Sequence, residues 1–63
     1  MRRKILIVED DPSFRRLVRA LLTARGYLVV GEAASAGEGL ALAAAVQPDA
    51  VLLDVDLPDG DGL

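Results

Sequence analysis

The acidic side chains are the residues of this chain best suited to chemistry, because most of them gather in two short stretches. Seven of the ten carboxylates lie in Glu9–Asp11 and Asp54–Asp61. Each stretch directly follows an apolar run, Ile5–Val8 in the first case and Ala50–Leu53 in the second. Carboxylates brought close together repel one another unless something neutralises them. Oxygen ligands favour hard cations such as Mg²⁺ or Mn²⁺, and a carboxylate beside such a cation can attack phosphorus as a nucleophile.

The composition excludes several other kinds of site. The chain has 63 residues and contains neither Cys nor His, which excludes disulfides, thiolate or imidazole metal sites and a Ser-His-Asp triad. The sequence contains no P-loop string, and no dinucleotide-binding glycine motif follows the first apolar run. An EF-hand loop starting at Asp54 is also excluded, because Pro58 would occupy its fifth position.

Charge and hydropathy give expectations about partners and location. Apolar residues make up 52% of the chain and charged residues 27%, as is typical of globular proteins. The net charge of −3 argues against nucleic acid as a direct partner. No apolar run is long enough to span a bilayer, and the run after the basic start Met1–Lys4 is too short for a signal peptide. We therefore expect a cytoplasmic protein without a membrane partner.

Three apolar runs predict the strands that would position the acids. Lys4–Val8, Tyr27–Val30 and Ala50–Leu53 lack polar alternation, and the second run fades through Gly31–Ala33. Runs of this kind are typical of strands buried on both faces of a parallel sheet.

Helical periodicity predicts a first helix between the first two strands, over about 12–25. Asp11 precedes a proline and is interpreted as the N-cap, and Gly26 supplies a left-handed stop. Apolar residues recur at helical spacing and form one stripe, made of Phe14, Leu17, Val18, Leu21 and Leu22.

A second helix is predicted between the second and third strands. Ser35 and Glu38 have the spacing of a capping box, in which hydroxyl and carboxylate each accept a hydrogen bond from a backbone amide. Pro48 ends this helix, since the residue before a proline avoids the helical region. Its apolar stripe consists of Ala36, Leu40, Ala43 and Ala44.

The element order is therefore β-α-β-α-β, which predicts an α/β fold with parallel strands and right-handed crossovers. We expect a partial doubly wound, flavodoxin-like sheet with strand order 2-1-3 and one helix on each face. The carboxyl ends of the first and third strands would then border the ligand crevice of such folds.

In this arrangement Glu9, Asp10 and Asp54 lie at two neighbouring strand ends, about 4.8 Å apart in the sheet. Mutual repulsion of these side chains predicts a bound Mg²⁺ or Mn²⁺. Five other acids have simpler interpretations as a helix cap, turn residues or structural and solvated groups: Asp11, Asp59, Asp61, Glu32 and Glu38.

Two segments resemble the response-regulator receiver domain of two-component signalling. Ile5–Arg16 resembles the opening of that domain, and Asp49–Leu63 resembles its phosphorylation-site segment. The spacing between the acid pair and the third-strand Asp also agrees. The resemblance covers all 63 residues.

The resemblance implies a role for four acids. Asp54 would be the phosphoacceptor, receiving a phosphoryl group from a histidine kinase or a phosphotransfer protein. Asp10 would bind Mg²⁺ directly and Glu9 through water. Asp56 would contribute its backbone carbonyl to the metal. The chain would not be an enzyme with a substrate of its own.

The chain is shorter than the family it resembles. A complete receiver domain has further strands and helices, including a hydroxyl residue and a Lys that contact the phosphoryl group. We therefore expect residues 1–63 to be the N-terminal half of a receiver domain, truncated before its third helix and without switching activity. An exposed third strand would favour a homodimer or a swapped oligomer.

Two alternatives stay open at this point. Asp54-Val-Asp56 resembles the nucleophile motif of haloacid-dehalogenase-like phosphohydrolases, which use an aspartyl-phosphate intermediate. Against it, Pro58 stands where that motif has Thr or Val, and the motif normally ends the first strand. The other alternative is a non-catalytic, self-associating fragment whose acids bind nothing.

Overall fold

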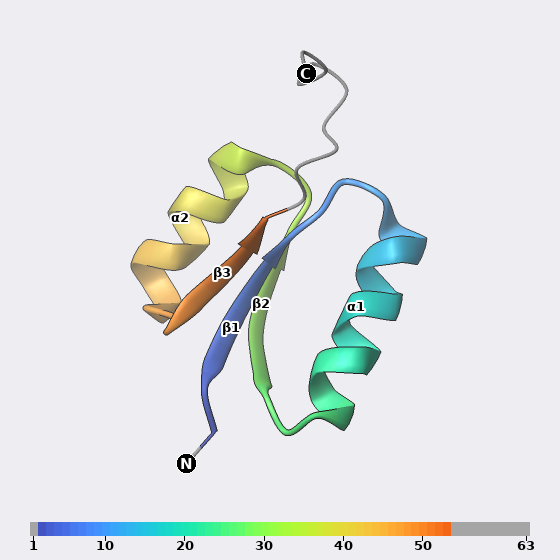
Figure 1. Cartoon of the computed structure of the whole chain (residues 1–63). Helices are drawn as coiled ribbons and strands as arrows, with labels where there is room; N and C mark the ends of the chain where they lie inside the picture. The colour runs from blue at the N-terminus through green and yellow to red at the C-terminus, as the bar shows by residue number, and fades with distance from the viewer. Residues whose placement is uncertain (1, 54–63) are drawn as a thin grey trace, which may run out of the picture.

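A computed structural model of the chain describes residues 2–53. The candidate site residues Asp54 and Asp56 lie outside this range. The elements follow the predicted order, with the bounds β1 Lys4–Val8, α1 Pro12–Ala24, β2 Leu28–Ala33, α2 Ala36–Val46 and β3 Ala50–Leu53 (Figure 1).

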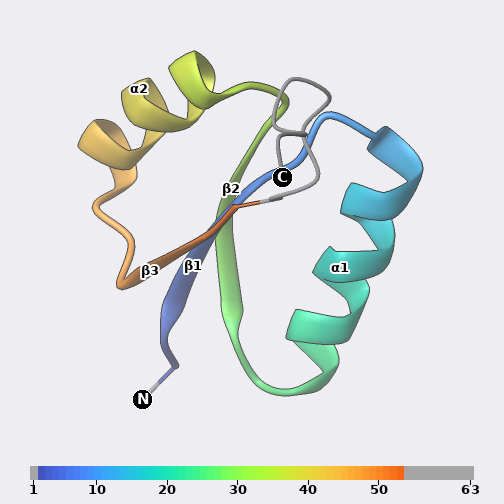
Figure 2. The same cartoon turned by 45° about the horizontal axis from the view of Figure 1, so that its top comes forward.

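The strands form one parallel sheet with β1 in the middle, in the order β2-β1-β3. The two helices cover opposite faces of this sheet, as both views show (Figures 1 and 2). The predicted α/β class and the strand order are thus confirmed. The described part of the chain contains no helix long and apolar enough to cross a membrane.

Strand β2 begins one residue later than predicted and includes the whole fading stretch Gly31–Ala33. The Tyr27 amide donates to the Leu22 carbonyl (3.0 Å) and so belongs to the end of α1, whereas the next amide, of Leu28, donates to the Arg3 carbonyl (2.9 Å) and starts the ladder. The strand then continues past Gly31 to Ala33, because β1 pairs with it over its whole length. β2 contains one residue more than β1. This extra residue is accommodated where the pairing of the two strands shifts register, between Ile5 and Leu6 of β1.

Helix α1 has the predicted caps. The Asp11 carboxylate accepts hydrogen bonds from the amides of Ser13 (3.0 Å) and Phe14 (3.4 Å). At the other end Gly26 has a φ of +91°, and its amide donates to the Thr23 carbonyl at 3.0 Å. Together with the Tyr27 bond this is a Schellman motif, which satisfies the last carbonyls of the helix.

Helix α2 begins with the predicted hydroxyl cap, since Ser35 Oγ accepts from the Glu38 amide at 3.2 Å. The Glu38 carboxylate reaches one residue further back than in a standard capping box, and accepts from the Ala34 amide at 2.8 Å. The helix ends at Val46 and is followed by Gln47, a left-handed cap residue (φ 49°) directly before Pro48.

The core between the sheet and α2 corrects the predicted stripe of that helix. The buried residues Leu6, Val8 and Ala33 pack against Leu42 and Ala43 of α2, together with a buried Gly39. Leu40, which the sequence assigned to the inner face, is 75% exposed. The reason is the close approach at Gly39: a Cβ atom there would lie 2.7 Å from Val8 Cγ2, so the helix turns this glycine toward the sheet.

The face toward α1 is covered less completely. Ile5 and Ile7 are buried in the sheet, and Val18 and Leu22 of the predicted stripe are half-buried. The other three stripe residues, Phe14, Leu17 and Leu21, are about half exposed, at 48%, 53% and 50%.

Strand β3 is the least covered element among residues 2–53. Neither helix packs on it, and Val51, Leu52 and Leu53 are 49%, 45% and 50% exposed. In the described part of the chain β3 is therefore an apolar edge strand.

Candidate functional site

The turn between β1 and α1 carries the acid pair Glu9-Asp10, and it is held by hydrogen bonds from three sides. The Glu9 amide donates to the Ala33 carbonyl at 2.9 Å, which extends the β1–β2 ladder by one residue beyond β1. One Glu9 carboxylate oxygen, Oε2, accepts from the Asp11 amide at 2.9 Å, and the residue is only 4% exposed. Glu9 is thus a buried carboxylate that helps to shape the turn.

Asp10 differs from its neighbour in exposure and in partners. It is exposed, and its carboxylate accepts no hydrogen bond from residues 2–53. Asp11 on its other side is committed to the helix cap, as predicted. Of the three consecutive acids, Asp10 therefore has the oxygens most available to an external ligand.

Arg15 supplies the third contact to the turn, a role that no local pattern in the sequence predicted. Its Nη1 donates to the Glu9 carbonyl at 2.8 Å, and its Nε donates to Glu32 Oε1 at 3.2 Å. Arg19, one helical turn later, donates from Nη1 to Glu32 Oε2 at 3.0 Å. One sequence signal was present: Glu32 is the only charged residue in β2, which is otherwise apolar or Gly.

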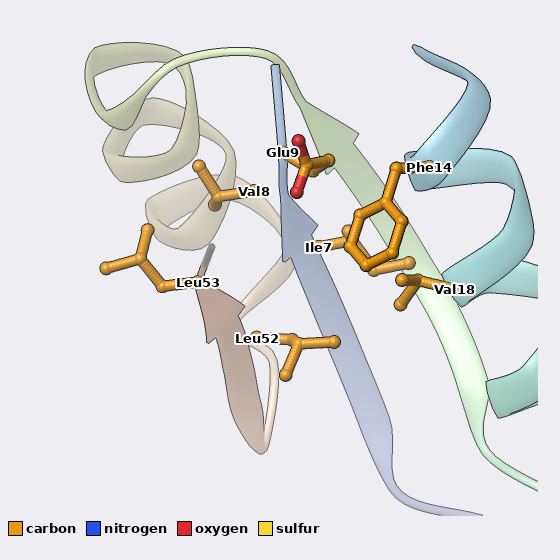
Figure 3. A pocket seen from close by; sticks show the side chains of 7 residues that line it. All are labelled: Ile7, Val8, Glu9, Phe14, Val18, Leu52 and Leu53. Atoms are coloured by element: carbon orange, nitrogen blue, oxygen red, sulfur yellow. The ribbon is translucent and has the colours of Figure 1, made fainter. Parts of the chain in front are cut away.

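An apolar pocket of about 230 Å³ lies beside the buried carboxylate (Figure 3). Its walls come from β1, α1 and β3, and its lining residues are Ile7, Val8, Glu9, Phe14, Val18, Leu52 and Leu53. Among the lining residues that belong to 2–53, Glu9 is the one that carries a charge. Apolar walls lower the local dielectric constant, so a charge that enters this region interacts more strongly with Glu9 than it would in water.

The two predicted acidic stretches are related through the strand register. Val8, which precedes Glu9, is the partner of Leu53, which precedes Asp54 in the sequence. Within residues 2–53 no group of three or more acidic, His or Cys side chains could hold a metal ion. Two of the four predicted metal residues, Glu9 and Asp10, are consecutive in the turn after β1, one buried and one exposed. Asp54 and Asp56 lie outside the described residues.

Comparison with known proteins identifies the family. Residues 5–63 match the response regulator receiver domain. The chain is 46% identical over 59 residues to the KDP operon transcriptional regulatory protein KdpE of Escherichia coli, covering 94% of the chain and 26% of that protein. It is 42% identical over 59 residues to the transcriptional regulatory protein KdpE of Mycobacterium tuberculosis, covering 94% of the chain and 26% of that protein.

A third relative is the transcriptional regulatory protein PdtaR of Mycobacterium tuberculosis, which is 39% identical over 61 residues, or 97% of this chain and 30% of that protein. The chain belongs to the receiver-domain family of two-component response regulators. It spans less than a third of the length of the curated relatives it matches.

Proposed function

We propose that this chain carries the phosphoacceptor site of a response regulator, with Asp54 receiving a phosphoryl group from a histidine kinase or a phosphotransfer protein. One observation carries the proposal beyond family membership: the register pairs Val8 with Leu53, the residues that precede Glu9 and Asp54 in the sequence. Parallel neighbouring strands end at the same edge of a sheet, which is where α/β folds bind ligands.

The residues around this edge suit Mg²⁺ by their donor chemistry. Asp10 is exposed and its oxygens are not used within residues 2–53, so we assign it a direct bond to the metal. Glu9 already accepts from the Asp11 amide and is buried, which favours an indirect role through water. Asp54 and the backbone carbonyl of Asp56 complete the proposed set. When bound, Mg²⁺ offsets the negative charge that gathers around the transferring phosphoryl group.

The proposed transfer balances without a further reactant. A carboxylate oxygen of Asp54 attacks the phosphorus of a phosphohistidine, and the phosphorus–nitrogen bond breaks. The electron pair of that bond stays on the departing nitrogen, and the released histidine is neutral because the other ring nitrogen of the phosphohistidine carries a proton. Asp54 becomes an aspartyl phosphate. The donor is another protein, so the chain acts as an acceptor and not as an enzyme on a separate substrate.

We further propose that residues 1–63 form the N-terminal half of the receiver domain, and that the cytoplasm is its location. Half a domain contains the metal and acceptor residues but not the hydroxyl and Lys that read the phosphorylated state. Residues 1–63 on their own would then lack switching activity, and would associate through the exposed edge of β3 as a homodimer or a swapped oligomer.

The phosphohydrolase alternative is not favoured. The family match covers residues 5–63 and is to receiver domains. In addition, Asp54 follows β3, the third strand along the chain, whereas the nucleophile motif of haloacid-dehalogenase-like enzymes normally ends the first strand.

A phosphorylation experiment on the intact protein tests the proposal. We expect incubation with acetyl phosphate and Mg²⁺ to add one phosphoryl group, mapped by mass spectrometry to the peptide that contains Asp54. Asp54→Asn should abolish the labelling, and omission of Mg²⁺ should prevent it. Asp59→Asn, the same change at a nearby acid without an assigned role, should label like the wild type. Equal labelling of the Asp54→Asn protein would refute the assignment.

A further inference from the structure

Arg15 makes two contacts at once, and they join two separate elements. Its Nη1 donates to the backbone carbonyl of Glu9 in the β1–α1 turn, and its Nε donates to the carboxylate of Glu32 in β2. The side chains of Arg15 and Glu32 are 22% and 25% exposed, so both groups are largely shielded from water. A guanidinium group is planar and rigid, and two-point binding of this kind fixes its orientation.

The contact to the Glu9 carbonyl acts directly on the position of Asp10. The Glu9 carbonyl and the Asp10 amide belong to the same planar peptide unit. The amide of Glu9 is already fixed by its bond to Ala33. With Arg15 on the carbonyl, both backbone groups of Glu9 are held, and the peptide plane that leads into Asp10 has little freedom to rotate.

The other end of the contact is firmly anchored. Glu32 lies in β2 and pairs with Ile7 of the central strand β1. It also forms a second ion pair, in which Arg19 Nη1 lies 3.0 Å from Glu32 Oε2. The chain of contacts therefore runs from the sheet, through Glu32 and the Arg15 guanidinium, to the peptide that carries Asp10.

From this geometry we infer that Arg15 is a positioning residue for the divalent cation, acting through the Glu9–Asp10 peptide. The inference rests on the proposed function, because it requires that Asp10 binds Mg²⁺. Arg15 does not touch the cation in this scheme. Its role is to keep the Asp10 carboxylate in one place before the cation arrives, so that binding does not have to order the turn.

The direction of the change in Mg²⁺ affinity distinguishes a positioning role of Arg15 from an effect of its positive charge. A positive guanidinium near a cation site repels the cation, so removal of the charge alone would strengthen Mg²⁺ binding. Removal of a positioning contact would weaken it, as substitutions of outer residues at metal sites typically do by about 10–100-fold. The two explanations thus predict opposite changes in Kd for the same variant.

The experiment measures the Mg²⁺ Kd of the intact protein from the shifts of the Asp10 and Asp11 amide signals in an NMR titration. Arg15→Gln should weaken binding by about tenfold. Arg15→Lys keeps the charge but not the two-point geometry, and should weaken binding as well. Arg16→Gln is the matched control, because it removes the same charge from the next residue of α1, which is exposed and makes no hydrogen bond or ion pair with residues 2–53. We expect an unchanged or slightly stronger affinity for that control.

The possible outcomes distinguish a failure of the positioning role of Arg15 from a failure of the proposed Mg²⁺ site. If the wild type shows no Mg²⁺-dependent shifts, the assignment of Asp10 to the metal fails. If the wild type binds and Arg15→Gln binds equally well or more tightly, only the positioning role fails. A purely structural role for Arg15 would lower Tm without changing Kd, so each Kd is measured at a temperature where thermal unfolding shows that variant to be folded. Should Arg15→Gln not fold, a wild-type Kd for Arg15→Lys would overturn the inference.

Discussion

Val8 of β1 and Leu53 of β3 are register partners at the carboxyl ends of two parallel neighbouring strands. The chain segments that carry them are separated by a helix, a strand and a second helix, yet the sheet brings them side by side. This pairing gives the acid pair after β1 a defined relation to the end of β3.

The first prediction separates the roles of two adjacent acids. Asp10→Asn should weaken Mg²⁺ binding by at least about tenfold, because it removes a proposed direct ligand, which should cost no less than loss of an outer contact. It should change the free energy of unfolding by less than about 0.5 kcal/mol, as is usual for an exposed side chain, and Asp10 accepts no hydrogen bond from residues 2–53. Isothermal titration and urea denaturation of the intact protein measure the two quantities.

Asp11→Ala should lower the stability of the protein and have little effect on its Mg²⁺ affinity. Loss of the cap on the Ser13 and Phe14 amides should lower the free energy of unfolding by about 1 kcal/mol. Mg²⁺ affinity of the folded protein should fall far less than in Asp10→Asn. Asp11→Ser, which can still cap the helix, should restore most of the stability. A larger loss of metal affinity at position 11 than at position 10 would reverse the assignment.

A pair of glycine substitutions in α2 tests the close contact between this helix and the sheet. Gly39→Ala should lower the free energy of unfolding by about 1–2 kcal/mol, because the new methyl group would meet the stiff, buried Val8 side chain at 2.7 Å. Gly37→Ala adds the same methyl group to the same helix at a position where no atom of residues 2–53 lies within 4 Å. It should raise the free energy by up to about 1 kcal/mol, through better helix propensity.

Urea denaturation of the intact protein measures both variants. Opposite signs are expected, and a stabilised Gly39→Ala protein would show that α2 does not pack as closely on β1 as described.

A further prediction concerns residues 1–63 expressed alone. The apolar edge of β3 should drive association, so light scattering at micromolar concentration should give a mass above that of a single 6.6 kDa chain. Leu52→Lys places a charge on this edge, and should shift the distribution toward monomer. Ala45→Lys adds the same charge at an exposed position of α2 and should leave the mass unchanged. A well-folded wild-type monomer would contradict the predicted homodimer or swapped oligomer.

Local sequence signals predicted the elements well, because short-range contacts decide them. Asp11-Pro12 marks the start of α1, and Gly26 marks its end because the αL conformation there carries no Cβ penalty. The apolar run Ile5–Val8 predicts a strand buried on both faces, and all four of these residues are buried. Errors occurred where packing between distant segments decided the outcome. Leu40 was predicted to lie in the buried stripe of α2, but Gly39 is the residue that fits tightly on Val8, and Leu40 is 75% exposed.

The same distinction between local and long-range contacts applies to the candidate site. The residue types and their positions after two apolar runs were sufficient to predict an acid pair and a receiver-like arrangement, because these depend only on the order of residues along the chain. Tertiary structure alone decided that Glu9 is buried and that Arg15 links the Glu9 carbonyl to Glu32. Such contacts depend on how α1 lies across β1 and β2, and that placement is set by packing and strand register between residues far apart in the sequence.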